Sequence, residues 1–371
     1  MINKKQDLRV GIIGAGNWAT TAHLPALAAQ PGVSVVGITD ANPDHTREFS
    51  EKFGVPAYPN LEQMLSKADL NILDVVTSRG MHFEPVMAGM KRNLDILCEK
   101  PLGHTIQETR KLYQESRARK LVTHMGFTFR YSPAIQYLRD LVHAGFVGKV
   151  YHVQGFEENA QLVNPHTPLP RIGFSRKTDS GALHGYGSHL LDLVRWTLGE
   201  FEQVMGDMAT YIKERPVLGE NTSLPVEVDD STIVLGKMMS GVQATMQFSK
   251  IAMGNGPGVE MRIFGSEAAL WVRLEESPLG YEHLWVADLA DRNFKPLPIP
   301  AQYKEGHDPN LNWPQDYYTA LVRHFIERVR ERETTEGSSD FSDGLRAQEL
   351  LEAIERSHFE RCWVTLKEVS E

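Results

Sequence analysis

A charged pair of residues follows an apolar run and directly precedes a proline. The stretch at 98–103 reads Cys-Glu-Lys-Pro-Leu-Gly, and it continues the strand-like run Asn93–Cys98. A surface turn would explain the pattern, because strands often end in charged residues and proline often follows them. Whether Lys100 does more than end a strand depends on the segments that come before it in the chain.

A glycine-rich turn near the N-terminus has the spacing of a nucleotide-binding loop. Residues 14–19 read G-x-G-x-x-A, between an apolar strand-like run and a helical one. Gly14 permits a tight turn, and Gly16 lets the backbone approach a pyrophosphate. The following helix offers free N–H groups to phosphate. Asp40 ends the next strand-like run, where a carboxylate would bind ribose hydroxyls. A glycine-rich turn without a ligand is the weaker explanation.

The residue types around Asp40 indicate which dinucleotide would bind. A carboxylate binds the ribose 2′-hydroxyl of NAD and repels the 2′-phosphate of NADP. The next residues, Ala41, Asn42 and Pro43, include no arginine, so NAD is favoured. Arg47 is the nearby cation that could weaken this preference.

The segments that must position these residues alternate between strand and helix. This alternation predicts a doubly wound parallel sheet, that is, an α/β Rossmann domain over residues 1–123. After residue 123 the pattern changes to paired strand-like runs such as "STIVLGKMMSGVQATMQFS" and "EMRIFGSEAALWVRL". These predict hairpins, and therefore an α+β domain with an open, mainly antiparallel sheet over residues 124–371. We expect this second domain to bind substrate and to form oligomers.

Composition excludes several classes of protein. The 371 residues carry a net charge of −9, which argues against nonspecific nucleic-acid binding. Cys98 and Cys362 are far apart and have no metal-like spacing, which suits a reducing compartment. The N-terminus is too polar for a signal peptide, and no apolar run approaches the roughly 20 residues that span a bilayer. We therefore expect a cytoplasmic protein without membrane or nucleic-acid partners.

Four segments, in order, resemble one enzyme family. They are "GIIGAGNWATTAHLPAL", "CEKPLG", "GFTFRYSPAIQYLRDLVHAGFVGKV" and "GALHGYGSHLLDLVRWTLG". Together they resemble the Gfo/Idh/MocA oxidoreductases, which are sugar and cyclitol dehydrogenases related to glucose–fructose oxidoreductase and inositol dehydrogenase. The resemblance implies an NAD(P)-dependent oxidoreductase of CH–OH groups. It would move hydride between nicotinamide and a secondary alcohol or ketone of a sugar, sugar derivative or cyclitol, without a metal.

The resemblance assigns catalytic roles to a lysine and a histidine. Lys100 would reach the nicotinamide and the reacting carbon and hydrogen-bond the substrate oxygen. His189 would accept the hydroxyl proton, as a neutral base near a helix start, and Asp192 could orient it. The family usually has D-x-G-x-H-x-x-D here, but Gly185 stands at the first aspartate. Tyr186 or His184 could compensate, although a structural role is at least as consistent for both.

The resemblance also implies two sets of contacts. The cofactor set is Gly14, Gly16, Asn17, Trp18, Asp40, Thr77, His82, Glu99 and Lys100. The substrate set is Lys100, Arg130, Tyr186, His189 and Asp192. For His82, core packing is as consistent as a cofactor contact, and for Arg130 the substrate contact is one of two possibilities.

Three further expectations complete the prediction. A protein that keeps this fold and senses NAD without chemistry is the alternative function; Gly185 favours it, whereas Lys100 and His189 argue against it. A homodimer or homotetramer is expected, joined through the open face of the second sheet. The Lys100–Pro101 bond is expected to be cis, since related enzymes with E-K-P often have a cis bond there and X–Pro bonds adopt cis at a cost of only about 0.5–1 kcal/mol.

Overall fold

The protein forms two compact units in a computed structural model, which describes residues 7–178, 180–256, 258–275, 281–333 and 338–370. The first unit is Met1–Tyr131 with Gly306–Gln348, and the second is Ser132–Glu305 with Glu349–Glu371. The sequence predicts a single boundary, between residues 123 and 124. The structure differs, because residues 306–348 return to the first unit. That return includes α8 (Trp313–Glu331), which packs against α1 (Leu24–Ala28).

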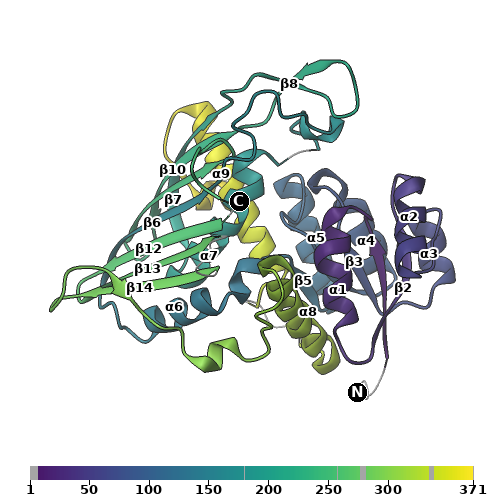
Figure 1. Cartoon of the computed structure of the whole chain (residues 1–371), viewed down its shortest axis with the longest axis horizontal. Coiled ribbons are helices and arrows are strands. Elements are labelled where there is room, and N and C mark those ends of the chain that lie inside the picture. The colour runs from purple at the N-terminus through teal and green to yellow at the C-terminus, as the bar shows by residue number, and fades with distance from the viewer. Residues whose placement is uncertain (1–6, 179, 257, 276–280, 334–337, 371) are drawn as a thin grey trace. The chain divides into compact units, whose positions relative to one another are not determined.

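The first unit contains the predicted parallel sheet (Figure 1). Its five strands have the order β2-β1-β3-β4-β5. They are β1 (Leu8–Ile13), β2 (Val33–Thr39), β3 (Ile72–Val75), β4 (Asp95–Cys98) and β5 (Thr123–Met125). Every residue of β3 and β4 is buried, as expected of parallel strands covered on both faces. The strand order reverses between β1 and β3, and ligands of such sheets bind at the carboxyl ends of the strands at this point.

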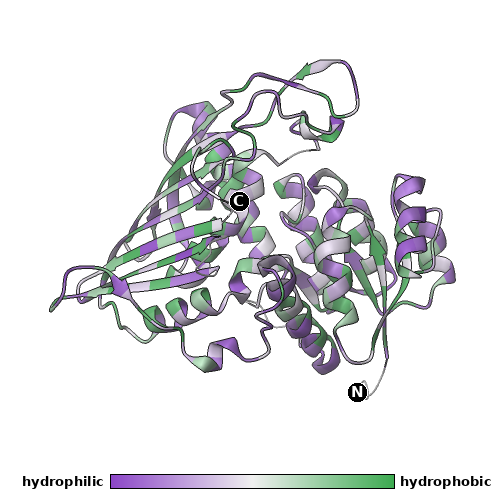
Figure 2. Cartoon of the chain, in the orientation of Figure 1, coloured by the Kyte–Doolittle hydropathy of each residue, from purple (hydrophilic) through white to green (hydrophobic). Residues whose placement is uncertain are grey.

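Helices surround this sheet. They are α1, α2 (Pro43–Phe53), α3 (Leu61–Lys67), α4 (Phe83–Lys91), α5 (Ile106–Arg119), α8 and the start of α9 (Phe341–Glu360), with short turns η1 (Ala19–His23), η2 (Arg79–Met81) and η3 (Thr128–Tyr131). Local sequence sets their limits: Asn42 and Thr105 cap α2 and α5 through their side-chain oxygens, and Gly54 ends α2 with φ 69°. Figure 2 shows apolar residues concentrated in the strands and polar residues on α2 and α3.

The second unit is built on a nine-stranded mixed sheet with the order β15-β14-β13-β12-β6-β11-β10-β7-β16. Its strands are β6 (Val150–Glu158), β7 (Phe201–Ala209), β10 (Ser231–Met238), β11 (Gln243–Ser249), β12 (Gly258–Gly265), β13 (Ala268–Glu275), β14 (Glu282–Asp288), β15 (Lys295–Pro296) and β16 (Val364–Thr365). A separate hairpin pairs β8 (Glu214–Pro216) with β9 (Ser223–Pro225). Among the strands that the structure describes in this sheet, only β6 and β11 pair in parallel, so the predicted mainly antiparallel sheet is confirmed.

Helices pack on one face of this sheet. α6 (Pro133–His143) contacts β13 and β14, α7 (Ser188–Leu198) contacts β6, and α9 reaches β7, where Ile354 lies against Gly206. The remaining short elements are η4 (Arg171–Gly173), η5 (Leu183–Gly187), η6 (Ala301–Lys304) and α10 (Leu366–Ser370). None of the helices in the described ranges is both long and apolar enough to span a bilayer.

Strand register shows that the two faces of the sheet differ. One row of paired residues is buried throughout: Gly206, Val234, Met246, Gly155, Met261, Val272 and Leu284. The next row, on the opposite face, is partly or fully exposed: Met205, Leu235, Thr245, Gln154, Arg262, Trp271 and Trp285. The strands therefore have one covered face and one open face, which matches the alternation of buried and exposed residues along β10 and β13.

Candidate active site

The glycine loop after β1 packs tightly against the protein at Gly14 and leaves open space over Gly16. Gly14 has φ +101°, and a Cβ added there would lie 2.6 Å from the carbonyl oxygen of Val76, so no other residue fits without strain. A Cβ on Gly16 would meet no atom within 4 Å. The space over Gly16 is therefore available to a ligand that approaches the backbone. Together with the helix that begins at Asn17, the loop fits the pyrophosphate of a dinucleotide.

Asp40 lies beside this loop. Its Oδ2 accepts a hydrogen bond from the Ala15 N–H at 2.7 Å, and its Oδ1 accepts one from the Asn42 N–H at 2.8 Å. The carboxylate is thus held at the end of β2 as the sequence predicts. Arg47 pairs with Asp44 at 2.7 Å on the surface of α2.

His82 joins two loops that follow neighbouring strands. It is fully buried, and its ring nitrogens lie 2.9 Å from the Pro101 carbonyl oxygen and 2.8 Å from the Thr77 carbonyl oxygen. Burial lowers the pKa of His82, although both carbonyl contacts oppose that shift. Thr77 in turn donates its hydroxyl to the Met81 carbonyl at 3.2 Å. These contacts favour a role in which His82 fixes the loop after β4, rather than a direct cofactor contact.

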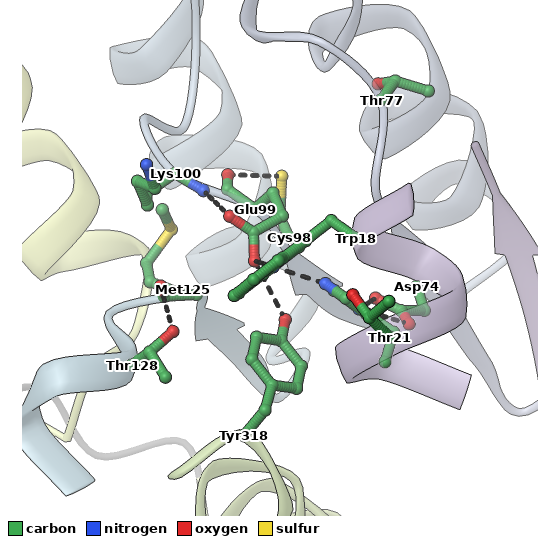
Figure 3. Close-up of polar contacts among 12 residues, drawn as sticks. Trp18, Thr21, Asp74, Thr77, Cys98, Glu99, Lys100, Met125, Thr128 and Tyr318 are labelled. Carbon is green, nitrogen blue, oxygen red and sulfur yellow. Dashed lines mark hydrogen bonds and ion pairs between the residues drawn. The ribbon is translucent and has the colours of Figure 1, made fainter. Parts of the chain in front are cut away.

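Glu99 is the centre of a buried polar cluster (Figure 3). Its Oε1 accepts hydrogen bonds from Trp18 Nε1 at 3.0 Å and Tyr318 OH at 3.1 Å, and His23 Nε2 lies 3.2 Å away. Its Oε2 accepts from the backbone N–H of Lys100 at 3.1 Å. Glu99 and Trp18 are both predicted cofactor contacts, but their polar groups bind each other within the first unit.

Lys100 follows this cluster. Its backbone is tied to Glu99, whereas Figure 3 shows its side chain pointing away from the Glu99 carboxylate. The Lys100–Pro101 peptide bond is cis, which confirms the prediction. Because β4 is fully buried and Lys100 is half-buried, the lysine stands where a buried strand emerges at the carboxyl edge of the sheet.

His189 belongs to the second unit and lies in α7. As the sequence predicts, it lies near the start of that helix, one residue after Ser188, but other helical backbone comes before α7. Helical backbone begins at Ala182 and continues through the π-helical turn η5 into α7, so His189 lies about two turns after the first helical residue. The dipole effect is confined to the first turn, and it therefore gives no reason for a neutral His189. The side chain is 9% exposed.

Ser180 and Lys250 lie nearest to Gly185, the position at which the resemblance leads one to expect an aspartate. A Cβ on Gly185 would lie 3.6 Å from Ser180 Cβ and 4.0 Å from Lys250 Nζ. The Lys250 ammonium also lies 5.6 Å from the centre of the Tyr186 ring. Tyr186 OH accepts a hydrogen bond from Asn159 at 2.6 Å. A lysine therefore stands beside the position at which the family usually has a carboxylate.

Three other residues named from the sequence have structural partners. Arg130, a predicted substrate contact, is 3% exposed and forms an ion pair with Asp343 at 3.1 Å. Asp192, expected to orient His189, is buried and pairs with Arg195 at 3.4 Å. His184, considered as a substitute for the aspartate, is buried with Nε2 3.0 Å from Glu355. These contacts favour roles in the core for all three.

Sequence reasoning missed His23, Asp74 and Tyr318. Asp74 carried a signal, because a carboxylate in the middle of the apolar run "NILDVVT" needs a buried partner. Its partner, His23, lies 51 residues earlier in the chain, and Tyr318 lies 219 residues after Glu99. Short-range patterns contain no information about such pairs.

Comparison with known proteins identifies the family. The model "Oxidoreductase family, NAD-binding Rossmann fold" matches residues 8–127, and the model "GFO/IDH/MocA C-terminal domain" matches residues 135–271. Levoglucosan dehydrogenase of Pseudarthrobacter phenanthrenivorans is 25% identical, over 98% of this chain and 100% of the relative. Myo-inositol 2-dehydrogenase of Thermotoga maritima is 24% identical, over 98% and 99%. Glucose-6-phosphate 3-dehydrogenase of Bacillus subtilis is 26% identical, over 93% and 94%.

A solved structure agrees with the sequence comparisons. Levoglucosan dehydrogenase in complex with NADH and levoglucosan has a TM-score of 0.87 and 25% identity, over 97% of this chain and all of that one. The two matched models belong to one family, follow each other in the right order and cover most of the chain. The family likeness, first seen in four short segments, therefore includes both units. This chain therefore belongs to the Gfo/Idh/MocA family, and it is an oxidoreductase with an NAD-binding Rossmann domain.

Proposed function

We propose that this protein is an NAD-dependent dehydrogenase or reductase of a secondary alcohol or ketone in a sugar, sugar derivative or cyclitol. The observation that carries the proposal is the glycine loop, closed behind Gly14 and open over Gly16, in a chain whose relatives are named for levoglucosan, glucose 6-phosphate and inositol. A solved relative was bound to both NADH and levoglucosan, which supports the same chemistry here.

Two residues carry the acid–base roles in this proposal. Bound NAD would supply the hydride acceptor for oxidation, or the donor for reduction in its reduced form. Lys100, on the first unit, would donate a hydrogen bond to the substrate oxygen and stabilise the negative charge that develops there. His189, on the second unit, would accept the hydroxyl proton during oxidation and return it during reduction.

Specificity for NAD over NADP is part of the proposal. Backbone N–H groups of Ala15 and Asn42 hold the Asp40 carboxylate at the end of β2. A fixed carboxylate at this place would bind ribose hydroxyls and repel a 2′-phosphate. Arg47, the nearby cation that could attract a 2′-phosphate, is instead paired with Asp44. This pairing also supports a preference for NAD.

A regulator that binds NAD without chemistry is the second candidate. Gly185 favours it, because the carboxylate usual in the family is missing. A super-repressor mutant of Gal80p from Saccharomyces cerevisiae has a TM-score of 0.82 at 16% identity, which shows only that the fold is shared. The presence of both Lys100 and His189 supports a catalytic function instead, because a sensor needs neither residue.

We also propose that the protein forms a homodimer or homotetramer through the open face of the second sheet. Ile233 and Leu235 are 52% and 43% exposed on β10, and Trp271 and Trp285 stack on the same face with ring centres 4.3 Å apart. Apolar side chains grouped on one face are typical of a surface that another subunit covers. A cytoplasmic location remains our proposal on the basis of composition.

Turnover tests the function directly. The purified protein is incubated with NAD or NADP and a panel of sugars, sugar derivatives and cyclitols, and formation of the reduced cofactor is followed by absorbance. We expect NAD-dependent turnover of at least one compound, and its loss in the Lys100→Ala variant. Tight NAD binding without turnover of any compound, in either direction, would favour the regulator.

A further inference from the structure

A histidine is buried between two carboxylates in the first unit, beside the residue before Lys100. His23 and Asp74 are both fully buried, with His23 Nδ1 2.8 Å from Asp74 Oδ2. His23 Nε2 lies 3.2 Å from Glu99 Oε1. The Tyr318 ring packs on the imidazole, with ring centres 4.2 Å apart.

This geometry favours an imidazolium with a proton on both ring nitrogens. A neutral imidazole would donate to one carboxylate and turn a lone pair toward the other. Burial lowers the pKa of His23, but Asp74 and then Glu99 outweigh burial and raise it to about 9. Burial raises the pKa of Asp74, and the His23 charge opposes that rise. The ionisable groups that face His23 are Asp74 from β3, Glu99 after β4 and Tyr318 from α8.

The charged histidine fixes the carboxylate that holds the Lys100 backbone. Glu99 accepts from His23, Trp18 and Tyr318 on Oε1 and from the Lys100 N–H on Oε2. On one side the carboxylate packs directly on Gly126, where an added Cβ would lie 2.5 Å from Glu99 Oε1. The chain Asp74–His23–Glu99 thus begins in one strand of the sheet and ends at the peptide that precedes the Lys100 side chain.

We propose that His23 and Asp74 are positioning residues for Lys100. They hold the Glu99 carboxylate in the one orientation that fixes the Lys100 backbone, and so they direct the ammonium toward the reacting carbon. The inference rests on the proposed function, since it assumes that Lys100 acts on the substrate. A buried ion cluster costs desolvation energy and is weak evidence for stability alone. Its placement against Lys100 points to alignment.

Conservative variants separate positioning from general stability. Asp74→Asn and His23→Gln keep approximate size and some hydrogen bonding, but each removes one charge from the cluster. Asp95→Asn is the matched control, because Asp95 is a buried aspartate at the other end of β4 that pairs with Arg332 and the Val122 N–H. It breaks a buried ion pair in the same unit, several residues along the strand from Lys100.

The first measurement is a mutant cycle. Asp74→Asn and His23→Gln are expected to lower kcat about 10-fold or more with a small change in NAD affinity, whereas Asp95→Asn lowers thermal stability and spares kcat. In the Lys100→Ala background the two cluster variants should cause no further loss of kcat, because the group they align is absent. Additive losses in that background would overturn the proposal.

The second measurement does not depend on turnover. Lys100 is labelled in the ligand-free protein with an amine-acylating reagent, and its rate of labelling as a function of pH is read by mass spectrometry, with exposed Lys52 as the internal reference. Both cluster variants should change the Lys100 profile several-fold, and Asp95→Asn should not. An unchanged Lys100 profile would overturn the proposal. Absence of turnover in the wild type would instead contradict the proposed function, and the labelling would still decide the positioning.

Discussion

His23 Nδ1 lies 2.8 Å from Asp74 Oδ2 in the interior of the first unit, where neither side chain is exposed. This pair joins the turn η1, just after the glycine loop, to the central strand β3. The same histidine also contacts Glu99, the residue before Lys100. One imidazole thus connects the proposed phosphate-binding segment with the proposed catalytic lysine inside a single unit.

The first prediction concerns the pH dependence of stability. The pKa of His23 is raised from 6.5 to about 9 in the folded state, so the folded protein binds the proton more tightly than the unfolded chain. The stabilisation is complete below pH 6.5 and is lost as the pH rises through about 9. It amounts to about 3 kcal/mol. Urea unfolding between these two pH values should show a decline that His23→Gln lacks. If the free energy of unfolding of the wild type and of His23→Gln changed in parallel with pH, the prediction would be contradicted.

The second prediction compares two glycines of one loop. Gly14→Ala should destabilise the protein by several kcal/mol or prevent folding, because its Cβ would meet the backbone of Val76 and its φ is +101°. Gly16→Ala should fold with a nearly unchanged Tm, because its Cβ meets nothing within 4 Å. It should nevertheless weaken NADH binding about 10-fold or more, since the methyl group occupies the ligand's space. Thermal melts and NADH fluorescence titrations measure both effects. Normal NADH affinity in Gly16→Ala would place the pyrophosphate elsewhere.

The third prediction is cofactor choice. Wild-type protein should prefer NAD over NADP by roughly tenfold or more, because one unfavourable charge contact is worth about 1–3 kcal/mol. Asp40→Ser should narrow the ratio of kcat/KM values for the two cofactors. If the wild type prefers NADP, the assignment of Asp40 is incorrect, and Arg47→Ala becomes the variant to measure.

The fourth prediction separates the lysine from the histidine. Lys100→Ala should leave NAD binding nearly intact and lower turnover about 100-fold or more, as the loss of a charge-stabilising donor does. His189→Ala should also lower turnover, but its defect should become smaller at high pH, where hydroxide can replace the missing base. Profiles of kcat against pH for the two variants give the comparison. Near-normal turnover in Lys100→Ala would indicate that the "CEKPLG" stretch is a surface turn without a catalytic role.

The fifth prediction concerns assembly. Wild-type protein should be larger than the 41.8 kDa monomer by light scattering at micromolar concentration. The double variant Ile233→Lys and Leu235→Lys should shift it toward monomer, because it places charge on the open sheet face. Met239→Lys is the control, since Met239 is 75% exposed but follows β10 in the hairpin turn. A monomeric wild type would refute the proposed assembly.

Local sequence determined the architecture and the nucleotide loop. Alternating strand-like and helical runs predicted the parallel sheet, because each run shows the period of the element it forms. The spacing of Gly14 and Gly16 fixed a turn that only glycine permits at its first position. Paired strand-like runs predicted the open, mainly antiparallel sheet of the second unit, and the strand pairing confirms it. All these features depend on residues within about one element of each other.

Only the tertiary structure decided which side chains meet. Glu99 gathers Trp18, His23 and Tyr318 from positions up to 219 residues away, and Arg130 is paired with Asp343. Lys250 stands beside Gly185 because β11 ends next to η5. The helical backbone before α7 also keeps His189 away from a free helix N-terminus. Such contacts arise when distant elements pack together. The burial and charge of the partner, which set the energy of each polar group, are absent from any local pattern.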